Sequence, residues 1–171
     1  MNDIMNWDDL WLKKGNENTT DLKTLNGFDV CNFKFTAEDT VNNIIKYCNI
    51  SKFDKILEIG SGAGRLGKIF LDKEYDYYAV ERSESLVNKF KLLVNKNKIE
   101  INKTNILPFQ DNSFDTVFCW SITQYFDSID NFHLLLNEMM RVSKKSILIG
   151  DIYEYEDNRK KEYKYKSTDL R

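Results

Sequence analysis

The sequence predicts an α/β protein built on a doubly wound, mostly parallel sheet. Short apolar runs alternate with segments in which apolar residues recur at helical spacing, and a glycine-rich turn separates the first run from the helix after it. Helices that follow strands in this order must cross over and return, which sets parallel strands side by side and covers both faces of the sheet. The 171 residues, 42% of them hydrophobic, suffice for one such domain.

Residues 1–35 are predicted to be an N-terminal cap made of a short helix and a loop. The segment is polar as far as about Asp29, and its main apolar residues are Trp7, Leu10, Trp11 and Leu12. We expect this cap to be an appendage of the core. Trp7 and Trp11 fit packing on the domain at least as well as they fit a wall of a substrate site.

The core is predicted over residues 36–155 and opens with a helix. Thr36 can cap this helix, whose apolar residues recur at helical spacing as far as Cys48. Two strand and helix pairs follow in order: a strand over 55–59 with a helix over about 63–73, and a strand over 77–80 with a helix that Ser83 can cap.

Three further strands are predicted at 99–101, 114–120 and 146–150. A turn-rich run introduces the second of them, and a helix over 131–142 precedes the third. After Asp151 the chain is rich in Tyr, Glu and Lys, and no apolar strand follows. Residues 156–171 are therefore predicted to be a charged tail, either a solvated helix face or a disordered end.

Charge and cysteine content narrow the choice of partners. A formal net charge of -2 offers no basic field for a nucleic acid. Cys31, Cys48 and Cys119 are odd in number and lack CxxC spacing, so neither a disulfide framework nor a metal site is expected. With no leader pattern and no run of 18 apolar residues, the sequence predicts a cytoplasmic protein without a membrane partner. It carries no signal of an oligomeric state.

The glycine turn predicts a nucleoside-like ligand. In a doubly wound sheet the loop after the first strand lies at the switch point, where ligands bind at the carboxyl ends of the strands. Gly60, Gly62 and Gly64 have no Cβ atoms, permit positive φ and leave the following helix open to an anion or polar group. Read from Gly62, the turn matches the dinucleotide fingerprint G-x-G-x-x-G, with Glu81 about twenty residues on, which would indicate NAD.

A second frame begins at the end of the strand and reads Glu58-Ile59-Gly60-Ser61-Gly62-Ala63-Gly64. This frame resembles the first motif of the class I, Rossmann-like, S-adenosylmethionine-dependent methyltransferases. A further run, Leu107-Pro108-Phe109-Gln110-Asp111-Asn112-Ser113-Phe114-Asp115-Thr116-Val117-Phe118, resembles the segment before the fourth strand of small-molecule methyltransferases, including the ubiquinone-biosynthesis type. Dehydrogenases have no such segment there. The resemblance covers residues 55–151 and favours the second frame.

The resemblance implies a site for S-adenosylmethionine and its product S-adenosylhomocysteine. Glu58, Gly60, Gly62 and the backbone near Ser61 would surround the methionine part, with Gly64 in the same turn. Glu81, at the end of the second strand, would accept hydrogen bonds from both ribose hydroxyls, a task that suits an acceptor-only carboxylate. Arg82 would lie along the adenine face.

The adenine contact departs from the family pattern. Similar proteins often have an acidic residue about five positions before the proline of the second segment, and this chain has Lys103 there. The contact to the adenine amino group is therefore expected from Asn105, or from the backbone at Thr104 and Asn105.

Methyl transfer needs a nucleophile about 3 Å from the methyl carbon and a site that excludes water. Gln124 and Tyr125 stand where similar sequences often carry two histidines, so the resemblance supplies no histidine base. Asp151, just past the fifth strand, is expected to contact or deprotonate the acceptor, with a loop-capping role equally open. Trp120 is expected to face the cofactor crevice, and the sole histidine, His133, to be structural or exposed.

Three functions follow from these patterns. The first is methyl transfer to a hydroxyl or amine of a small polar molecule, such as a sugar or a cell-surface polysaccharide precursor. The second is a catalytically silent methyltransferase-like subunit that stabilises a partner. The third is an NAD-dependent oxidoreductase, if the frame from Gly62 is the functional one. Related methyltransferases commonly add an antiparallel hairpin as strands six and seven, and we expect this chain to lack it, as a truncated or a minimal version.

Overall fold

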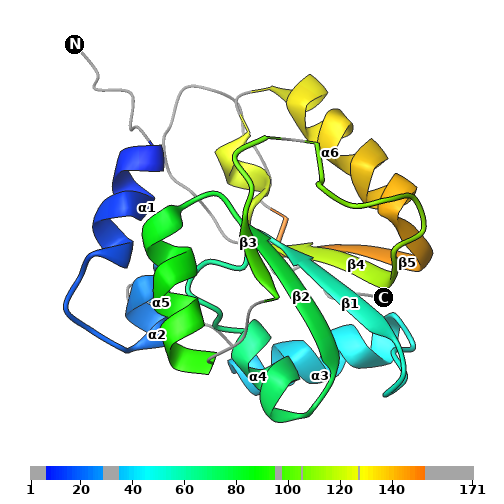
Figure 1. Cartoon of the computed structure of the whole chain (residues 1–171), viewed down its shortest axis with the longest axis horizontal. Coiled ribbons are helices and arrows are strands. Elements are labelled where there is room, and N and C mark those ends of the chain that lie inside the picture. Colours follow the sequence, from blue (N-terminus) through cyan, green and yellow to red (C-terminus); the bar gives the residue numbers. More distant parts are fainter. Residues whose placement is uncertain (1–6, 29–34, 95–97, 105, 127, 153–171) are drawn as a thin grey trace.

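A computed structural model describes residues 7–28, 35–94, 98–104, 106–126 and 128–152 (Figure 1). The strands of this described part form one sheet in the order β3-β2-β1-β4-β5, and every neighbouring pair is parallel. The strand order reverses at β1, which pairs with β2 on one side and with β4 on the other. The predicted fold class is thus confirmed.

The elements have the following bounds. The strands are β1 (Lys55–Ile59), β2 (Asp76–Glu81), β3 (Ile99–Ile101), β4 (Phe114–Trp120) and β5 (Ser143–Gly150). The helices are α1 (Trp7–Gly15), α2 (Leu22–Leu25), α3 (Ala37–Tyr47), α4 (Gly67–Asp72), α5 (Glu84–Val94) and α6 (Ile129–Val142), with a 3-10 turn η1 (Thr123–Tyr125).

Two hydrophobic clusters lie on the two faces of the sheet. One joins α3, α4 and α5 to the sheet through side chains such as Phe70 and Phe90. The other joins α6 to the sheet through Leu135 and Met139. Figure 1 shows α6 on the side of the sheet opposite to α3 and α4. Helices thus pack on both faces of the sheet, and sheets built in this way bind ligands at the carboxyl ends of their strands.

The first core helix begins as the sequence predicts. Thr36 precedes α3, and its hydroxyl accepts a hydrogen bond from the Asp39 N–H at 3.0 Å. The Asp39 carboxylate accepts one from the Thr36 N–H at 3.0 Å, which completes a capping box. The helix ends before Asn49, whose φ of 49° is incompatible with a right-handed helix.

The helix after β1 begins later than predicted. The pattern predicts residues 63–73, whereas α4 spans Gly67–Asp72. Gly62 and Gly64 have φ values of 56° and 88°, which a right-handed helix cannot accommodate. The Gly64 N–H donates to the Ser61 carbonyl at 3.0 Å and so closes a turn in place of the first helical residues.

Other boundaries differ from the prediction in smaller ways. The strands β1, β3 and β4 have the predicted bounds, while β2, α6 and β5 are longer than predicted. Ser128 explains the earlier start of α6, because its hydroxyl accepts the Asn131 N–H at 3.2 Å. The N-terminal segment contains a second helix, α2, capped by the Asp21 side chain, where only a loop is predicted.

One arginine fastens the segment that leads into β4. Arg141 of α6 donates to the carbonyls of Leu107 and Phe109 at 3.1 and 2.8 Å, and it pairs with Asp111 at 2.8 Å. Glu138 pairs with the same arginine at 2.6 Å and accepts the Leu107 N–H at 2.8 Å. These bonds hold this segment, which connects β3 to β4, against the end of α6.

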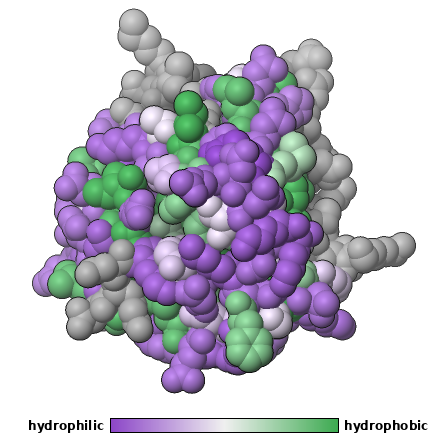
Figure 2. All heavy atoms as spheres, turned by 45° about the vertical axis from the view of Figure 1, so that its right-hand side comes forward, coloured by the Kyte–Doolittle hydropathy of each residue, from purple (hydrophilic) through white to green (hydrophobic). Residues whose placement is uncertain are grey.

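The surface drawn in Figure 2 carries both hydrophilic and hydrophobic residues. Hydrophilic residues predominate on this face, and hydrophobic ones are scattered among them. Within the described part of the chain, no helix combines the length and the apolar character that a bilayer span requires.

Candidate ligand site at the carboxyl ends of the strands

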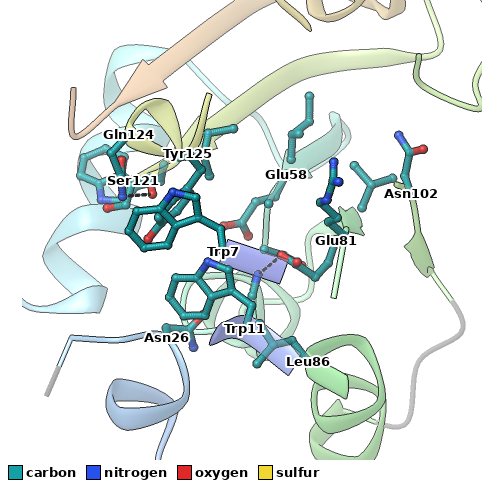
Figure 3. Close-up of a pocket in the computed structure, with 18 of the residues that line it drawn as sticks. Trp7, Trp11, Asn26, Glu58, Glu81, Leu86, Asn102, Ser121, Gln124 and Tyr125 are labelled. Atoms are coloured by element: carbon teal, nitrogen blue, oxygen red, sulfur yellow. Dashed lines mark hydrogen bonds between the residues drawn. The ribbon is translucent and has the colours of Figure 1, made fainter. Parts of the chain in front are cut away.

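A cavity of about 560 Å³ opens at the point where the strand order reverses. The carboxyl ends of β1, β2 and β4 reach it, together with the glycine turn after β1, the start of α5, η1, α6 and the N-terminal segment 7–28 (Figure 3). The segment after β3 contributes Asn102, Thr104 and Leu107. A cavity of this size holds a ligand of a few dozen atoms, and a switch point is where doubly wound folds bind one. We therefore take it as the candidate site.

The glycine turn presents its backbone to this cavity. The Gly60 N–H donates to the Val80 carbonyl at 2.8 Å, which ties the start of the turn to β2. Gly60 and Gly62 have φ values of 73° and 56°. A Cβ at Gly62 would lie 2.0 Å from the side-chain oxygen of Asn26, so a side chain there would be strained by the positive φ and would push Asn26 away from the Ala63 N–H.

Glu81 is held at the end of β2 by backbone groups on two sides. Its carboxylate accepts the Gly62 N–H at 2.8 Å and the Ser83 N–H at 2.8 Å. Burial raises the pKa of Glu81, while these backbone N–H groups and Arg82 oppose that rise. Each oxygen that accepts one backbone bond keeps a second lone pair, so the carboxylate can also accept two hydroxyl groups of a ligand.

Glu58, at the end of β1, is a buried carboxyl group beside the same cavity. Only 3% of its surface is exposed, and its Oε2 accepts a hydrogen bond from the hydroxyl of Tyr77. Burial raises the pKa of Glu58 to about 7, with the Tyr77 hydrogen bond opposing the rise. Arg65, also at the cavity, attracts the Glu58 charge and lies 4.4 Å from the Phe28 ring centroid.

Two buried polar atoms at the cavity have no hydrogen-bond partner among the described residues. They are the Ser61 hydroxyl oxygen and the side-chain oxygen of Gln124. The Gln124 amide is oriented by its other end, since Nε2 donates to the Ser121 carbonyl at 2.7 Å (Figure 3). A buried polar group without a hydrogen-bond partner destabilises the folded state by about 1–3 kcal/mol. A bound ligand that supplies the partner removes this penalty, so the two atoms are candidate ligand contacts.

The N-terminal segment forms one wall of the cavity. Trp7 and Trp11 of α1 meet Tyr125 of η1 edge to face, with ring centroids 4.7 and 5.6 Å apart (Figure 3). Asn26 reaches the glycine turn, where its side-chain oxygen accepts the Ala63 N–H at 3.1 Å. The segment expected to be an appendage is therefore part of the site. The tryptophans gave a signal for this in the sequence, but Asn26 gave none.

An ion pair joins the same wall to β2. The Arg82 guanidinium donates to the Asp8 carboxylate at 2.7 and 3.0 Å and to the Lys103 carbonyl at 3.3 Å. Arg82 still lies beside the region predicted for the adenine ring, next to Thr104. In this position its guanidinium links α1 to the loop after β3.

Most residues predicted for the site lie around the one cavity: Glu58, Gly60, Ser61, Gly62, Glu81, Arg82, Thr104, Trp120, Gln124 and Tyr125. Gly64 and Asp151 are not among the lining residues. Gly64 packs on Phe90, where a Cβ would lie 2.2 Å from a ring carbon. Asp151 accepts a hydrogen bond from the hydroxyl of Ser121, which does line the cavity. Asn105 lies outside the described residues.

Comparison with known proteins identifies the family of the chain and finds the same fold in solved structures. The methyltransferase domain family matches residues 57–149. A S-adenosylmethionine-dependent methyltransferase from Methanosarcina mazei superposes with a TM-score of 0.58 at 17% identity, over 63% of this chain and 56% of the other. No curated protein sequence matches the chain.

Two further solved structures share the fold. The YcgJ protein of Bacillus subtilis superposes with a TM-score of 0.57 at 22% identity, over 68% of this chain and 51% of the other. The PH0226 protein of Pyrococcus horikoshii gives 0.57 at 22% identity, over 67% and 56%. The chain thus spans little more than half the length of these solved proteins.

Proposed function

The chain belongs to the methyltransferase domain family, and from this premise we propose that it binds S-adenosylmethionine in the cavity and transfers the methyl group to a hydroxyl or amine of a small polar molecule. The observation that carries the proposal is the convergence of Glu81, the glycine turn and the unpaired Ser61 hydroxyl on one cavity at the switch point. Family membership argues against the NAD-dependent oxidoreductase.

The residues present fit this donor from end to end. Glu58 supplies a negative charge for the ammonium of the methionine part. The Ser61 hydroxyl, whose oxygen has no hydrogen-bond partner among the described residues, can bond to the polar groups of the same part. Glu81 offers acceptors for two ribose hydroxyls. Asn102, Thr104 and Leu107 form the wall at the end of β3, where the adenine ring would lie. Bound S-adenosylmethionine supplies a methyl group on a positively charged sulfur, activated for attack by a nucleophile.

The opposite end of the cavity suits an acceptor with one hydrogen-bond donor. The Gln124 side-chain oxygen, fixed by the Ser121 carbonyl, accepts from an O–H or N–H and so orients the lone pair of that atom. An amide oxygen is too weak a base to keep the proton. As the methyl group is transferred, the acceptor atom gives its proton to the Ser121 hydroxyl, which borders the cavity, while that hydroxyl gives its own proton to the Asp151 carboxylate to which it is hydrogen-bonded. Trp7, Trp11 and Tyr125 exclude water.

Calorimetric titration with S-adenosylmethionine and S-adenosylhomocysteine tests the donor site. We expect micromolar binding of both that falls about 100-fold in Glu81→Ala, because two charge-assisted hydrogen bonds are lost. Glu100→Ala, an exposed acid on β3, is the matched control and should bind like the original chain. NADH is the control ligand. Binding of NADH alone would reject the proposal.

The silent-subunit alternative needs a second measurement. A chain that binds the donor but forms no S-adenosylhomocysteine with any member of a panel of amines and alcohols would support that alternative. If one acceptor is methylated, Gln124→Leu should raise its KM and leave the affinity for S-adenosylhomocysteine within about twofold, because Gln124 contacts only the acceptor in this arrangement.

A further inference from the structure

A tyrosine hydroxyl reaches Glu58 from inside the core. Glu58 on β1 pairs with Ala79 on β2, and Tyr77 lies two residues earlier on β2, so Tyr77 and Glu58 are diagonal neighbours on one face of the sheet. The Tyr77 side chain is fully buried, and its hydroxyl donates to Glu58 Oε2. The two groups form a buried pair directly below the glycine turn.

The fold makes room for this hydroxyl. The Tyr77 ring stacks on Phe70 with centroids 5.7 Å apart and lies 6.3 Å from the Phe90 ring, an environment that a phenylalanine would fill equally well. At Gly67 a Cβ would lie 2.4 Å from the Tyr77 oxygen, so the glycine leaves the space that the oxygen occupies. Packing alone therefore does not account for a tyrosine at this position.

The charges around Glu58 come from several elements. Glu81 at the end of β2 repels its negative charge, and Arg65 in the turn before α4 attracts it. Arg65 in turn interacts with Asp151 after β5, and on β4 the thiol of Cys119 is held neutral by burial and by Glu58. Burial raises the pKa of Glu58 to about 7, and the hydrogen bond from Tyr77 is the strongest of the influences that lower it.

We propose that Tyr77 is a positioning residue of the donor site, whose hydroxyl holds the Glu58 carboxylate in place and turned toward the ammonium group of the methionine part. This inference rests on the proposed function, because it takes Glu58 as the partner of that ammonium. Tyr77 itself is buried below the turn and does not line the cavity. It acts through Glu58 alone.

The proposal predicts a particular pH dependence of donor binding. Affinity rises as Glu58 ionises near pH 7 and falls at higher pH, as the ligand's own amino group loses its proton. Without the Tyr77 hydroxyl the pKa of Glu58 rises further, so the rising limb moves to higher pH and the falling limb stays in place. The window of strong binding becomes narrower, and the maximum affinity falls.

The experiment compares Tyr77→Phe with Tyr78→Phe. Tyr78 is the next residue of β2, lies on the other face beside Phe114 and is half-buried, so it is a matched control. The affinity for S-adenosylhomocysteine is measured by calorimetry from about pH 5.5 to about pH 9. We expect Tyr77→Phe to bind about tenfold more weakly at pH 7, with its rising limb shifted upward, and Tyr78→Phe to follow the original chain.

A second ligand separates positioning from structural damage. Methylthioadenosine has the adenosine part but no amino acid, so its affinity should be the same in both variants and independent of Glu58. Equal weakening of both ligands in Tyr77→Phe, or an unshifted pH profile, would overturn the proposal. If the original chain binds neither ligand at any pH, the proposed function itself fails.

Discussion

The two ends of the cavity are built in different ways. At the donor end, Glu58, the glycine turn and Glu81 lie on or next to two paired strands, and backbone hydrogen bonds fix their positions. At the proposed acceptor end, Trp7 and Tyr125 come from segments more than 100 residues apart and meet through their side-chain rings. The donor end is therefore determined by local sequence, and the acceptor end by tertiary packing.

The largest effect is expected from adding one carbon to the glycine turn. Gly64→Ala combines a positive φ of 88° with a Cβ 2.2 Å from the Phe90 ring. We expect a loss of about 3 kcal/mol in the free energy of unfolding, measured in urea. Gly27→Ala, with φ 72° but a nearest contact of 3.1 Å to Trp11, is the control on the other wall and should lose about 1 kcal/mol. Equal losses would mean that packing at the turn is unimportant.

A double-mutant cycle measures how firmly the acceptor wall is assembled. Trp7→Ala, Tyr125→Ala and the double variant should reveal a coupling of about 1 kcal/mol in unfolding free energy, because the two rings meet at 4.7 Å. The affinity for S-adenosylhomocysteine should change by less than about threefold in all three variants. Additive losses of unfolding free energy would mean that the two rings do not stabilise each other. A large loss of affinity for S-adenosylhomocysteine would mean that donor binding depends on the acceptor wall.

The smallest effect is expected at the ion pair that links the two ends. Asp8 and Arg82 are more than half exposed, so Asp8→Asn should cost at most about 0.5 kcal/mol and nothing measurable in 1 M salt. The hydrogen bond from Arg82 lowers the pKa of Asp8, so this contribution is present above the unfolded pKa of Asp8 and is lost as the pH falls through the folded value. Thermal unfolding at two salt concentrations checks the first expectation, and acid titration of Tm checks the second.

This difference between the two ends explains which features could be predicted from the sequence. The alternation of strands and helices predicted the parallel sheet, and the frame from Glu58 indicated the strand ends at which the cavity opens, because neighbouring residues determine both. The start of α4 was predicted too early, because apolar spacing does not reveal where positive φ values interrupt a helix.

Residues that act across the fold could not be predicted in the same way. Asn26 meets the glycine turn only because α1 and α2 dock on the domain, and no local pattern marks an asparagine in a loop for that task. The role of the Tyr77 hydroxyl could not be predicted either, because tyrosine and phenylalanine are both common in the apolar run of a strand. Its partner on the next strand becomes visible only with the register of β1 and β2.

The position of α1 also has a consequence for synthesis of the chain. On the ribosome α1 emerges well before the groups that receive it, which lie later in the chain. Its backbone carbonyls at Trp11 and Leu12 accept hydrogen bonds from Ser85, and its tryptophan rings meet Tyr125. The contact between these rings and Tyr125 therefore cannot form until about residue 125 has left the exit tunnel, so completion of this wall comes late in vectorial folding.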